Sequence, residues 1–172
     1  RRARGKRGEN SLHRSRQPQM FFHPGKKLTF MGSEFGQFIE WNEWSELDWH
    51  LLDYESHMGI YNYIKKLNHF YRKYKELHEI DFKYDGFLWN DVHNKNESII
   101  GFSRYDSNGN HLLMIFNFTP INRKDYWIKI HKLTNYEILL CSDELAYGGC
   151  SEISNKSFNP FLKGEDIYIS YD

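Results

Sequence analysis

The most informative stretch of the sequence lies between Gly32 and Trp49, where three tryptophans are interspersed with carboxylates and amides. Tryptophan rings stack on the apolar faces of sugars, while carboxylates and amides form hydrogen bonds with sugar hydroxyls. These residue types are compatible with a surface that holds a polyhydroxylated ligand. Taken by themselves, they favour a tryptophan-rich loop packed into a core. The tryptophans, acids and amides of the stretch are Glu34, Gln37, Glu40, Trp41, Asn42, Glu43, Trp44, Glu46, Asp48 and Trp49.

Two pairs of acids in this stretch are close enough in sequence to suggest catalysis, namely Glu40 with Glu43 and Glu46 with Asp48. Glycosyl transfer with retention needs two carboxyl groups about 5 to 5.5 Å apart, one as the nucleophile and one as the acid and base. Acids this close together on a polar loop are usually solvated surface charges. We therefore predict no catalytic residue among them.

Other kinds of site are disfavoured by residue spacing. The nine histidines do not show the spacing of a metal site, and no serine lies in a Gly-x-Ser-x-Gly elbow. The glycines form no phosphate-binding or dinucleotide-binding pattern, so we predict neither a cofactor nor a metal. Cys141 and Cys150 are nine residues apart and are expected to be free thiols, with a disulfide or a metal site as the less favoured alternative.

The elements that would position the tryptophan-rich stretch flank it on both sides. Residues before it read as a helix end or a loop, followed by an apolar run from Leu28 to Met31 that predicts a short buried strand. From Gly59 onward, apolar residues recur at spacings of three and four, which predicts an amphipathic helix of about four turns. Its expected buried face consists of Ile60, Tyr63, Ile64, Leu67, Phe70, Tyr71 and Tyr74.

Beyond His78 the pattern becomes that of short strands. Residues 98–105 and 111–118 flank a five-residue loop that contains Asn108 and Gly109. This arrangement predicts a β-hairpin, because Asn-Gly tolerates positive φ. Several short strands at this spacing indicate an antiparallel sandwich or barrel. The other strands are expected at residues 87–89, 125–130, 136–141 and 166–171.

The order of the motifs is more specific than their composition. The sequence resembles the end of the catalytic barrel and the following domain of the glycogen (1,4-α-glucan) branching enzymes of the α-amylase superfamily. The resemblance covers about residues 20–150. The motifs that carry it are His23 to Lys27, Phe30 to Gly32, Glu34 to Gln37, Glu40 to Asn42, Leu47 to Leu52, Leu77 to Phe82, Gly86 to Trp89, Asn117 to Pro120, Asn135 to Glu137 and Tyr147 to Gly149.

The resemblance implies an α+β fold class made of two parts. Residues 20–76 would be the last βα unit of a (β/α)8 barrel: strand eight, its loop and helix eight. Residues 77–172 would be a C-terminal all-β antiparallel sandwich, incomplete at its last strand. Asp166 to Tyr171 resembles the family's penultimate strand, so one sheet edge would be left unpaired.

The resemblance also implies where a glucan would bind. Barrel active sites are built from loops at the carboxyl ends of the strands, so residues 32–49 would form one wall of the cleft. Glu34, Trp41 and Asn42 are the candidate substrate contacts. Trp44 stands where an acid is more usual in the family, which leaves its role open. Asp48, Trp49 and His50 are expected to pack under the loop.

The implied function is that of the C-terminal part of a branching enzyme, which transfers an α-1,4-glucan segment to a 6-hydroxyl and so forms an α-1,6 branch. The family's three catalytic carboxylates lie on strands four, five and seven, before the region matched here, so this chain alone is expected to be inactive. The expected partners are an α-glucan such as glycogen or amylose and the missing N-terminal barrel portion of the same enzyme. A cytoplasmic location is expected.

Two other functions remain open. One is a non-catalytic glucan-binding module whose tryptophan loop or sandwich grips glucan. The other is a part of a related trehalohydrolase or debranching enzyme, which also closes its barrel before a β-sandwich. The Leu-Asp-Trp-His-Leu motif at residues 47–51 and the Asn-Phe-Thr-Pro motif at residues 117–120 favour branching.

The first 19 residues differ from the rest in charge. Seven Lys or Arg side chains and one acid occur before residue 20, without apolar periodicity, which predicts a basic disordered arm at residues 1–19. An altered reading frame or an expression artefact accounts for it better than a real basic tail, and we expect no nucleic-acid partner. No apolar run reaches the roughly 18 residues that a membrane span requires, so no membrane partner is expected.

Overall fold

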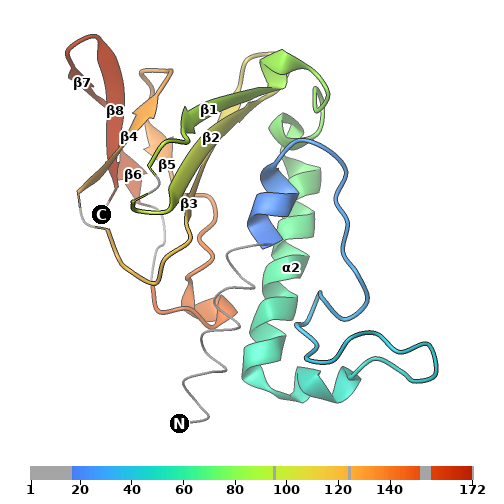
Figure 1. Cartoon of the computed structure of the whole chain (residues 1–172). Coiled ribbons are helices and arrows are strands. Elements are labelled where there is room, and N and C mark those ends of the chain that lie inside the picture. Colours follow the sequence, from blue (N-terminus) through green and yellow to red (C-terminus); the bar gives the residue numbers. More distant parts are fainter. Residues whose placement is uncertain (1–16, 95, 124, 152–155, 172) are drawn as a thin grey trace. The chain divides into compact units, whose positions relative to one another are not determined.

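A computed structural model describes residues 17–94, 96–123, 125–151 and 156–171. The described chain divides into two compact units (Figure 1). The first runs to Lys75 and also includes the segment that begins at Ser142. The second comprises Glu76–Cys141 together with residues 156–171.

The first unit opens with a short helix at residues 17–22, the blue helix of Figure 1. Pro18 stands near its start, where the missing N–H removes no helical hydrogen bond. Phe21 and Phe22 are buried, and the Phe22 ring contacts that of Phe70 edge-on at 5.7 Å between ring centroids. The prediction of a disordered arm was therefore wrong for residues 17–19, and residues 1–16 lie outside the described part.

The predicted strand at Leu28 to Met31 is not formed. Residues 26–30 have no regular secondary structure, and the side chains of Leu28, Phe30 and Met31 are exposed. A β-strand is held by hydrogen bonds to its neighbours, and none of the described strands pairs with this run. The prediction was therefore wrong, because an apolar run becomes a strand only where neighbouring strands supply its hydrogen bonds.

Helix α2 extends over Glu55–Lys73, preceded by the 3-10 turn η1 at Trp49–Asp53. The predicted helix is confirmed, and it begins four residues before Gly59. Tyr71 and Tyr74, also assigned to the inward face, are only half buried. The buried face contains His57, Gly59, Ile60, Tyr63, Ile64, Leu67 and Phe70.

The segment from Ser142 to Ser151 packs on helix α2, although it was predicted to belong to the β-domain at residues 77–172. It contains the 3-10 turn η4, Leu145–Tyr147, whose Tyr147 ring lies 4.9 Å from that of Tyr63 between centroids. A Cβ atom on Gly59 would lie 3.0 Å from the Tyr147 carbonyl, so a glycine in the helix makes this approach possible. Sequence periodicity cannot predict that a segment far along the chain packs back onto helix α2.

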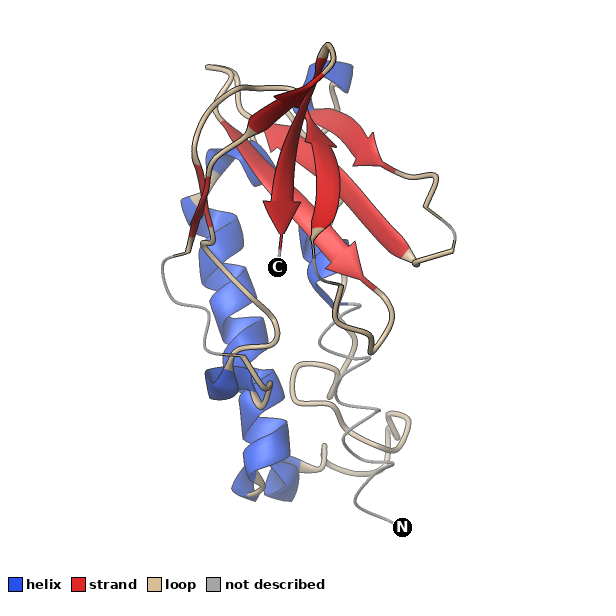
Figure 2. Ribbon diagram, turned by 90° about the vertical axis from the view of Figure 1, so that its left-hand side faces the viewer, coloured by secondary structure: helices blue, strands red, loops and turns tan. Residues whose placement is uncertain are grey.

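The second unit is built from eight strands among its described residues, and every paired strand in it is antiparallel (Figure 2). The first sheet has the order β1-β2-β3, the second β4-β8-β7, and β5 pairs with β6. The 3-10 turns η2, Lys75–Leu77, and η3, Tyr84–Gly86, precede the first strand. The strand bounds are β1 Phe87–Asp91, β2 Ile99–Tyr105, β3 His111–Asn117, β4 Tyr126–Ile130, β5 Tyr136–Glu137, β6 Ser157–Phe158, β7 Phe161–Lys163 and β8 Asp166–Tyr171.

The predicted hairpin is confirmed as β2 and β3, joined by residues 106–110. Gly109 has a φ of 78°, and the buried Asp106 carboxylate accepts hydrogen bonds from the backbone N–H groups of Asn108 and Asn110. The strands expected at residues 87–89, 125–130 and 166–171 also form. The expected strand at residues 136–141 is shortened to β5, Tyr136–Glu137, and one further backbone hydrogen bond, from the Ile138 N–H to the Lys156 carbonyl, follows it.

The sheet edge that was expected to stay unpaired does not lie at Asp166 to Tyr171 itself. Strand β8 is the central strand of its sheet, with β4 on one side and β7 on the other. Strand β7 supplies the second partner, and it was missed because three residues are too few to show a period of two.

The core of the second unit lies between the two three-stranded sheets. Ile128, Ile130 and Ile169 are buried, and Leu113 and Ile115 of the first sheet pack against them. A Cβ atom on Gly101 of β2 would collide with the Ile128 side chain, so the glycine allows the sheets to approach closely. Asn90 adds a polar tie, because its amide donates to the Lys129 carbonyl and accepts from the Ser103 hydroxyl.

Candidate functional site

The tryptophan-rich stretch begins with a tightly wound turn. The N–H groups of Phe35 and Gln37 both donate to the Gly32 carbonyl, at 3.3 and 2.9 Å. Gly32 has a φ of 82°, and a Cβ atom there would lie 2.7 Å from the Gln37 Cβ. Glycine is therefore required at this position by both backbone conformation and space.

Phe35 fixes this turn to helix α2. Its side chain is fully buried, and its carbonyl accepts a 2.8 Å hydrogen bond from Nδ1 of His57, a buried residue in the first turn of the helix. Because a carbonyl can only accept, the Nδ1 atom carries the proton. The Trp49 ring packs on Phe35 at 5.2 Å between centroids. His57 thus has a positioning role that its sequence context did not reveal.

Gln37 closes the base of the loop that follows. Its side-chain oxygen accepts from the Asp48 N–H at 2.9 Å, and its side-chain nitrogen donates to the Ile39 carbonyl at 3.1 Å. The two ends of residues 38–47 are thereby held together by one side chain. We name residues 38–47 the tryptophan loop, and it projects from this fixed base.

Two of the three candidate substrate contacts lie on the tryptophan loop. The Trp41 side chain is 42% exposed, and its ring meets the Phe30 ring edge-on at 6.0 Å between centroids. Asn42 is exposed, and its side-chain oxygen accepts a 3.0 Å hydrogen bond from the Trp44 N–H. This contact turns the chain after Trp41 and leaves the Asn42 amide NH2 group to donate to a ligand. Trp44 itself is 87% exposed.

The third candidate, Glu34, lies in the wound turn before the tryptophan loop and is half buried. Within the described part of the chain no hydrogen bond or ion pair engages its carboxylate. Trp41 and Asn42 are sequence neighbours on the tryptophan loop, whereas Glu34 lies in the turn that precedes it.

The residues assigned to packing under the loop behave differently from one another. Trp49 packs on Phe35 but stays half exposed, and Asp48 is held through its backbone. His50 is exposed, so its assignment to packing was wrong. A 3-10 turn at Trp49–Asp53 rotates it away from the buried Leu51.

The electrostatic character of the tryptophan loop is acidic. Glu40, Glu43 and Glu46 are all exposed and make no hydrogen bond with described residues. The sequence holds no Lys or Arg between residues 28 and 64, so the surface offers acceptors for hydroxyl groups rather than a site for phosphate. The interpretation as solvated surface charges is confirmed for Glu40, Glu43 and Glu46, whereas Asp48 is half buried.

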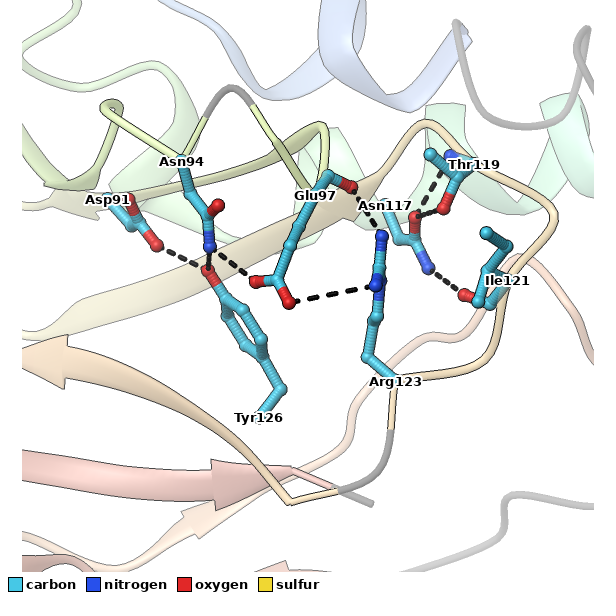
Figure 3. Close-up of polar contacts among 8 residues, drawn as sticks. All are labelled: Asp91, Asn94, Glu97, Asn117, Thr119, Ile121, Arg123 and Tyr126. Carbon is cyan, nitrogen blue, oxygen red and sulfur yellow. Dashed lines mark hydrogen bonds and ion pairs between the residues drawn. The ribbon is translucent and has the colours of Figure 1, made fainter.

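A second group of polar residues lies in the β unit, and sequence reasoning did not find it (Figure 3). The Tyr126 hydroxyl of β4 donates to the Asp91 carboxylate of β1 at 2.5 Å and accepts from the Asn94 amide at 2.9 Å. Burial, followed by the hydrogen bond to Asp91, raises the pKa of Tyr126 to about 12. Asn94 also donates to Glu97, whose carboxylate pairs with Arg123 at 3.6 Å.

The Asn-Phe-Thr-Pro motif ends beside this polar network (Figure 3). The Asn117 side-chain oxygen accepts from both the backbone N–H and the hydroxyl of Thr119, while its nitrogen donates to the Ile121 carbonyl. These contacts fix the turn between β3 and β4. The motif is therefore a structural element of the β unit, and the network joins β1 to β4.

A shallow depression of about 370 Å³ in the β unit is lined by residues that include Ile80, Lys83, Tyr105 and Ser107. Among the described residues, no group of three or more His, Cys, Asp or Glu could hold a metal ion. Neither cysteine forms a disulfide. No helix in this part of the chain is sufficiently long and apolar to cross a bilayer.

Comparison with known proteins agrees with this architecture. Residues 89–164 match the family described as alpha amylase, C-terminal all-beta domain. The chain is 46% identical over 136 residues to a 1,4-alpha-glucan branching enzyme GlgB of Oceanobacillus iheyensis, covering 78% of this chain and 21% of the relative. It is 47% identical over 131 residues to the enzyme of the same name from Aquifex aeolicus, covering 76% of this chain and 21% of the relative.

A third relative with this name, from Halothermothrix orenii, is 44% identical over 142 residues, which is 82% of this chain and 22% of the relative. The chain thus spans about a fifth of the length of the curated relatives that it matches. The identity extends over most of this chain, and the matched family model is that of a C-terminal domain. Together they indicate the C-terminal region of the relatives. The chain therefore belongs to the 1,4-alpha-glucan branching enzyme family and corresponds to its C-terminal part.

Proposed function

We propose that this chain works as the C-terminal part of an enzyme that transfers an α-1,4-glucan segment to a 6-hydroxyl and so creates α-1,6 branches. In this proposal the carboxylates that react lie in the part of the enzyme before the matched region. The chain contributes the closing unit of the barrel, one wall of the glucan cleft and the β-domain. It has no branching activity by itself.

The observation that carries this proposal is the exposure of the apolar run before the tryptophan loop. Leu28, Phe30 and Met31 are exposed, and Leu28 is 80% exposed. Large exposed apolar surface in a soluble protein marks a place where another surface docks. The run lies where the family has strand eight, so barrel strands on either side would cover it and would supply its missing hydrogen bonds.

Glu34, Trp41 and Asn42 support a role for this surface in binding glucan. In the proposal, the exposed Trp41 ring stacks on a sugar, and the free amide NH2 group of Asn42 donates to a hydroxyl. The half-buried Glu34 carboxylate accepts from another hydroxyl. Gln37, Phe35 and His57 hold the base of the loop, so the contacts are presented by a fixed frame.

The test is reconstitution. The N-terminal part of the Aquifex aeolicus relative is fused to this chain at the start of the matched region, and α-1,6 linkages formed from amylose are measured by debranching and chain-length analysis. We expect branching by the fusion, and none by this chain alone or by the N-terminal part alone. A folded but inactive fusion would contradict the proposal, and so would branching by this chain alone.

A further inference from the structure

The outer face of the second sheet carries a row of aromatic rings that the proposed function does not use. Ile128, Ile130 and Ile169 of β4 and β8 point into the core. Since successive side chains of a strand alternate between faces, Trp127 and Tyr168 lie on the opposite face. Phe161 of β7 pairs directly with Tyr168 and lies on that face too.

The rings of these three residues form one continuous surface across three strands. The Trp127 and Phe161 centroids are 5.2 Å apart at an interplanar angle of 76°, and those of Phe161 and Tyr168 are 6.1 Å apart at 27°. The Lys163 ammonium lies over the Trp127 ring, 4.5 Å from its centroid. We name Trp127, Phe161 and Tyr168 the aromatic platform.

The platform is accessible. Trp127 is 45% exposed, and Phe161 and Tyr168 are half buried. A tryptophan that served only the core would bury its ring and satisfy its indole N–H. Here the ring instead packs on its neighbours and leaves area open to a ligand.

The charges around the platform indicate which ligand fits. Lys129 and Asp166 form an ion pair at 2.6 Å on the same sheet, so these two charges largely cancel. A polyanion or an acidic membrane surface is held by several uncompensated cations. The platform instead has aromatic rings, the Lys163 ammonium beside them and the neutralised pair of Lys129 and Asp166. Such a surface suits a neutral ligand that has apolar faces and many hydroxyls.

We propose that the aromatic platform is a second binding site for the α-1,4-glucan chain, separate from the cleft wall at Glu34, Trp41 and Asn42. This inference rests on the proposed function, since it assigns the same substrate class to another surface. Trp127 supplies the main stacking face once a sugar displaces the Lys163 ammonium from its ring, and Tyr168 of β8 and Phe161 of β7 extend that face. Lys163, Lys129 and Asp166 exchange hydrogen bonds with sugar hydroxyls at its border.

Affinity electrophoresis of the full 172-residue chain in native gels with and without amylose tests this inference. We expect amylose to retard the chain, and Trp127→Ala to weaken the binding about fivefold to tenfold, the effect of losing one stacked ring. Trp127→Phe should keep part of the binding, because it keeps a ring. The matched control is Tyr84→Ala, which removes a fully exposed aromatic from the same unit and should leave retardation unchanged.

Several outcomes would overturn the inference. These are equal retardation of the wild type and Trp127→Ala, no retardation of the wild type at all, or equal losses in Trp127→Ala and Tyr84→Ala. A change of elution volume on gel filtration with Trp127→Ala alone would show that the face joins copies of the chain. The fusion assay for branching is independent of this experiment. An active fusion whose chain does not bind amylose through the platform would contradict only the second binding site. An inactive fusion whose platform does bind amylose would contradict only the proposed function.

Discussion

The guanidinium of Arg104 lies 2.5 Å from the carboxylate of Asp81, and the Arg104 side chain is completely buried. Arg104 also donates to the carbonyls of Gly86 and Leu77, both at 3.1 Å. One side chain of β2 therefore organises the whole connection from η2 to β1. A buried charge is tolerated only when it is paired in this way, because an unpaired one carries a large desolvation cost.

We predict that Asp81→Ala lowers the free energy of unfolding by about 3 to 5 kcal/mol, because it leaves the Arg104 charge buried without its ionic partner. Urea unfolding followed by circular dichroism measures the change. The double variant Asp81→Leu/Arg104→Met removes both charges and should be more stable than Asp81→Ala. If Asp81→Ala unfolds like the wild type, the pair does not hold this connection.

The close approach of the two sheets gives a second prediction. Gly101→Ala places a methyl group against Ile128 in the core, and we expect a loss of about 1 to 3 kcal/mol from overpacking. Ile128→Val in the same chain removes a methyl from the other side and should recover part of the loss. Additive losses in the double variant, measured by thermal unfolding, would show that Gly101 and Ile128 do not compete for space.

Alkaline pH should destabilise the β unit through Tyr126. Its pKa is about 12 in the folded chain against an ordinary value of 10, so the folded state holds the hydroxyl proton more tightly. The resulting stabilisation is complete below about pH 10 and is lost as the pH rises toward 12. Burial, followed by the neighbouring Tyr105, raises the pKa of Tyr136 to about 12, so this residue contributes in the same direction.

The Tyr126→Phe variant tests this pH effect. It should be less stable than the wild type at pH 8, because Asp91 and Asn94 lose their shared partner. It should also lose less stability between pH 10 and 12. Equal slopes of stability against pH for the two chains, from urea unfolding at each pH, would exclude Tyr126 as the group responsible.

The sequence predicted those elements whose cause is local. The hairpin of β2 and β3 follows from two β-rich runs around Asn108 and Gly109, and helix α2 follows from its apolar period. Whether Leu28 to Met31 forms a strand depends on neighbouring strands, and a local sequence pattern carries no information about them. The Arg104–Asp81 pair and the packing of Tyr147 on α2 join residues far apart in sequence, so they could not be inferred from spacing.

The same distinction applies to the candidate site. The exposed acids of the loop could be predicted from composition, whereas composition alone favoured buried tryptophans and only the family resemblance pointed to a tryptophan surface that meets a ligand. The frame beneath them could not, because Gln37, Phe35 and His57 act through specific hydrogen bonds. Whether Glu34, Trp41 and Asn42 contact glucan stays a prediction, and Trp41 offers its sharpest test.

We predict that Trp41→Ala in the fused enzyme lowers kcat/KM for branching about fivefold to tenfold, because one stacking contact with the substrate is worth about 1 kcal/mol. Stability should change by no more than about 1 kcal/mol, since the ring is 42% exposed and its one described aromatic contact is with Phe30. Trp44→Ala is the matched control on the same loop, and at 87% exposure it should have the smaller effect on branching. Activity and melting temperature are measured on both variants.

Two outcomes would contradict the prediction. Normal branching with a much lower melting temperature in Trp41→Ala would show that Trp41 belongs to the core. Equal losses of branching in Trp41→Ala and Trp44→Ala would show that the loop acts without a specific contact at Trp41.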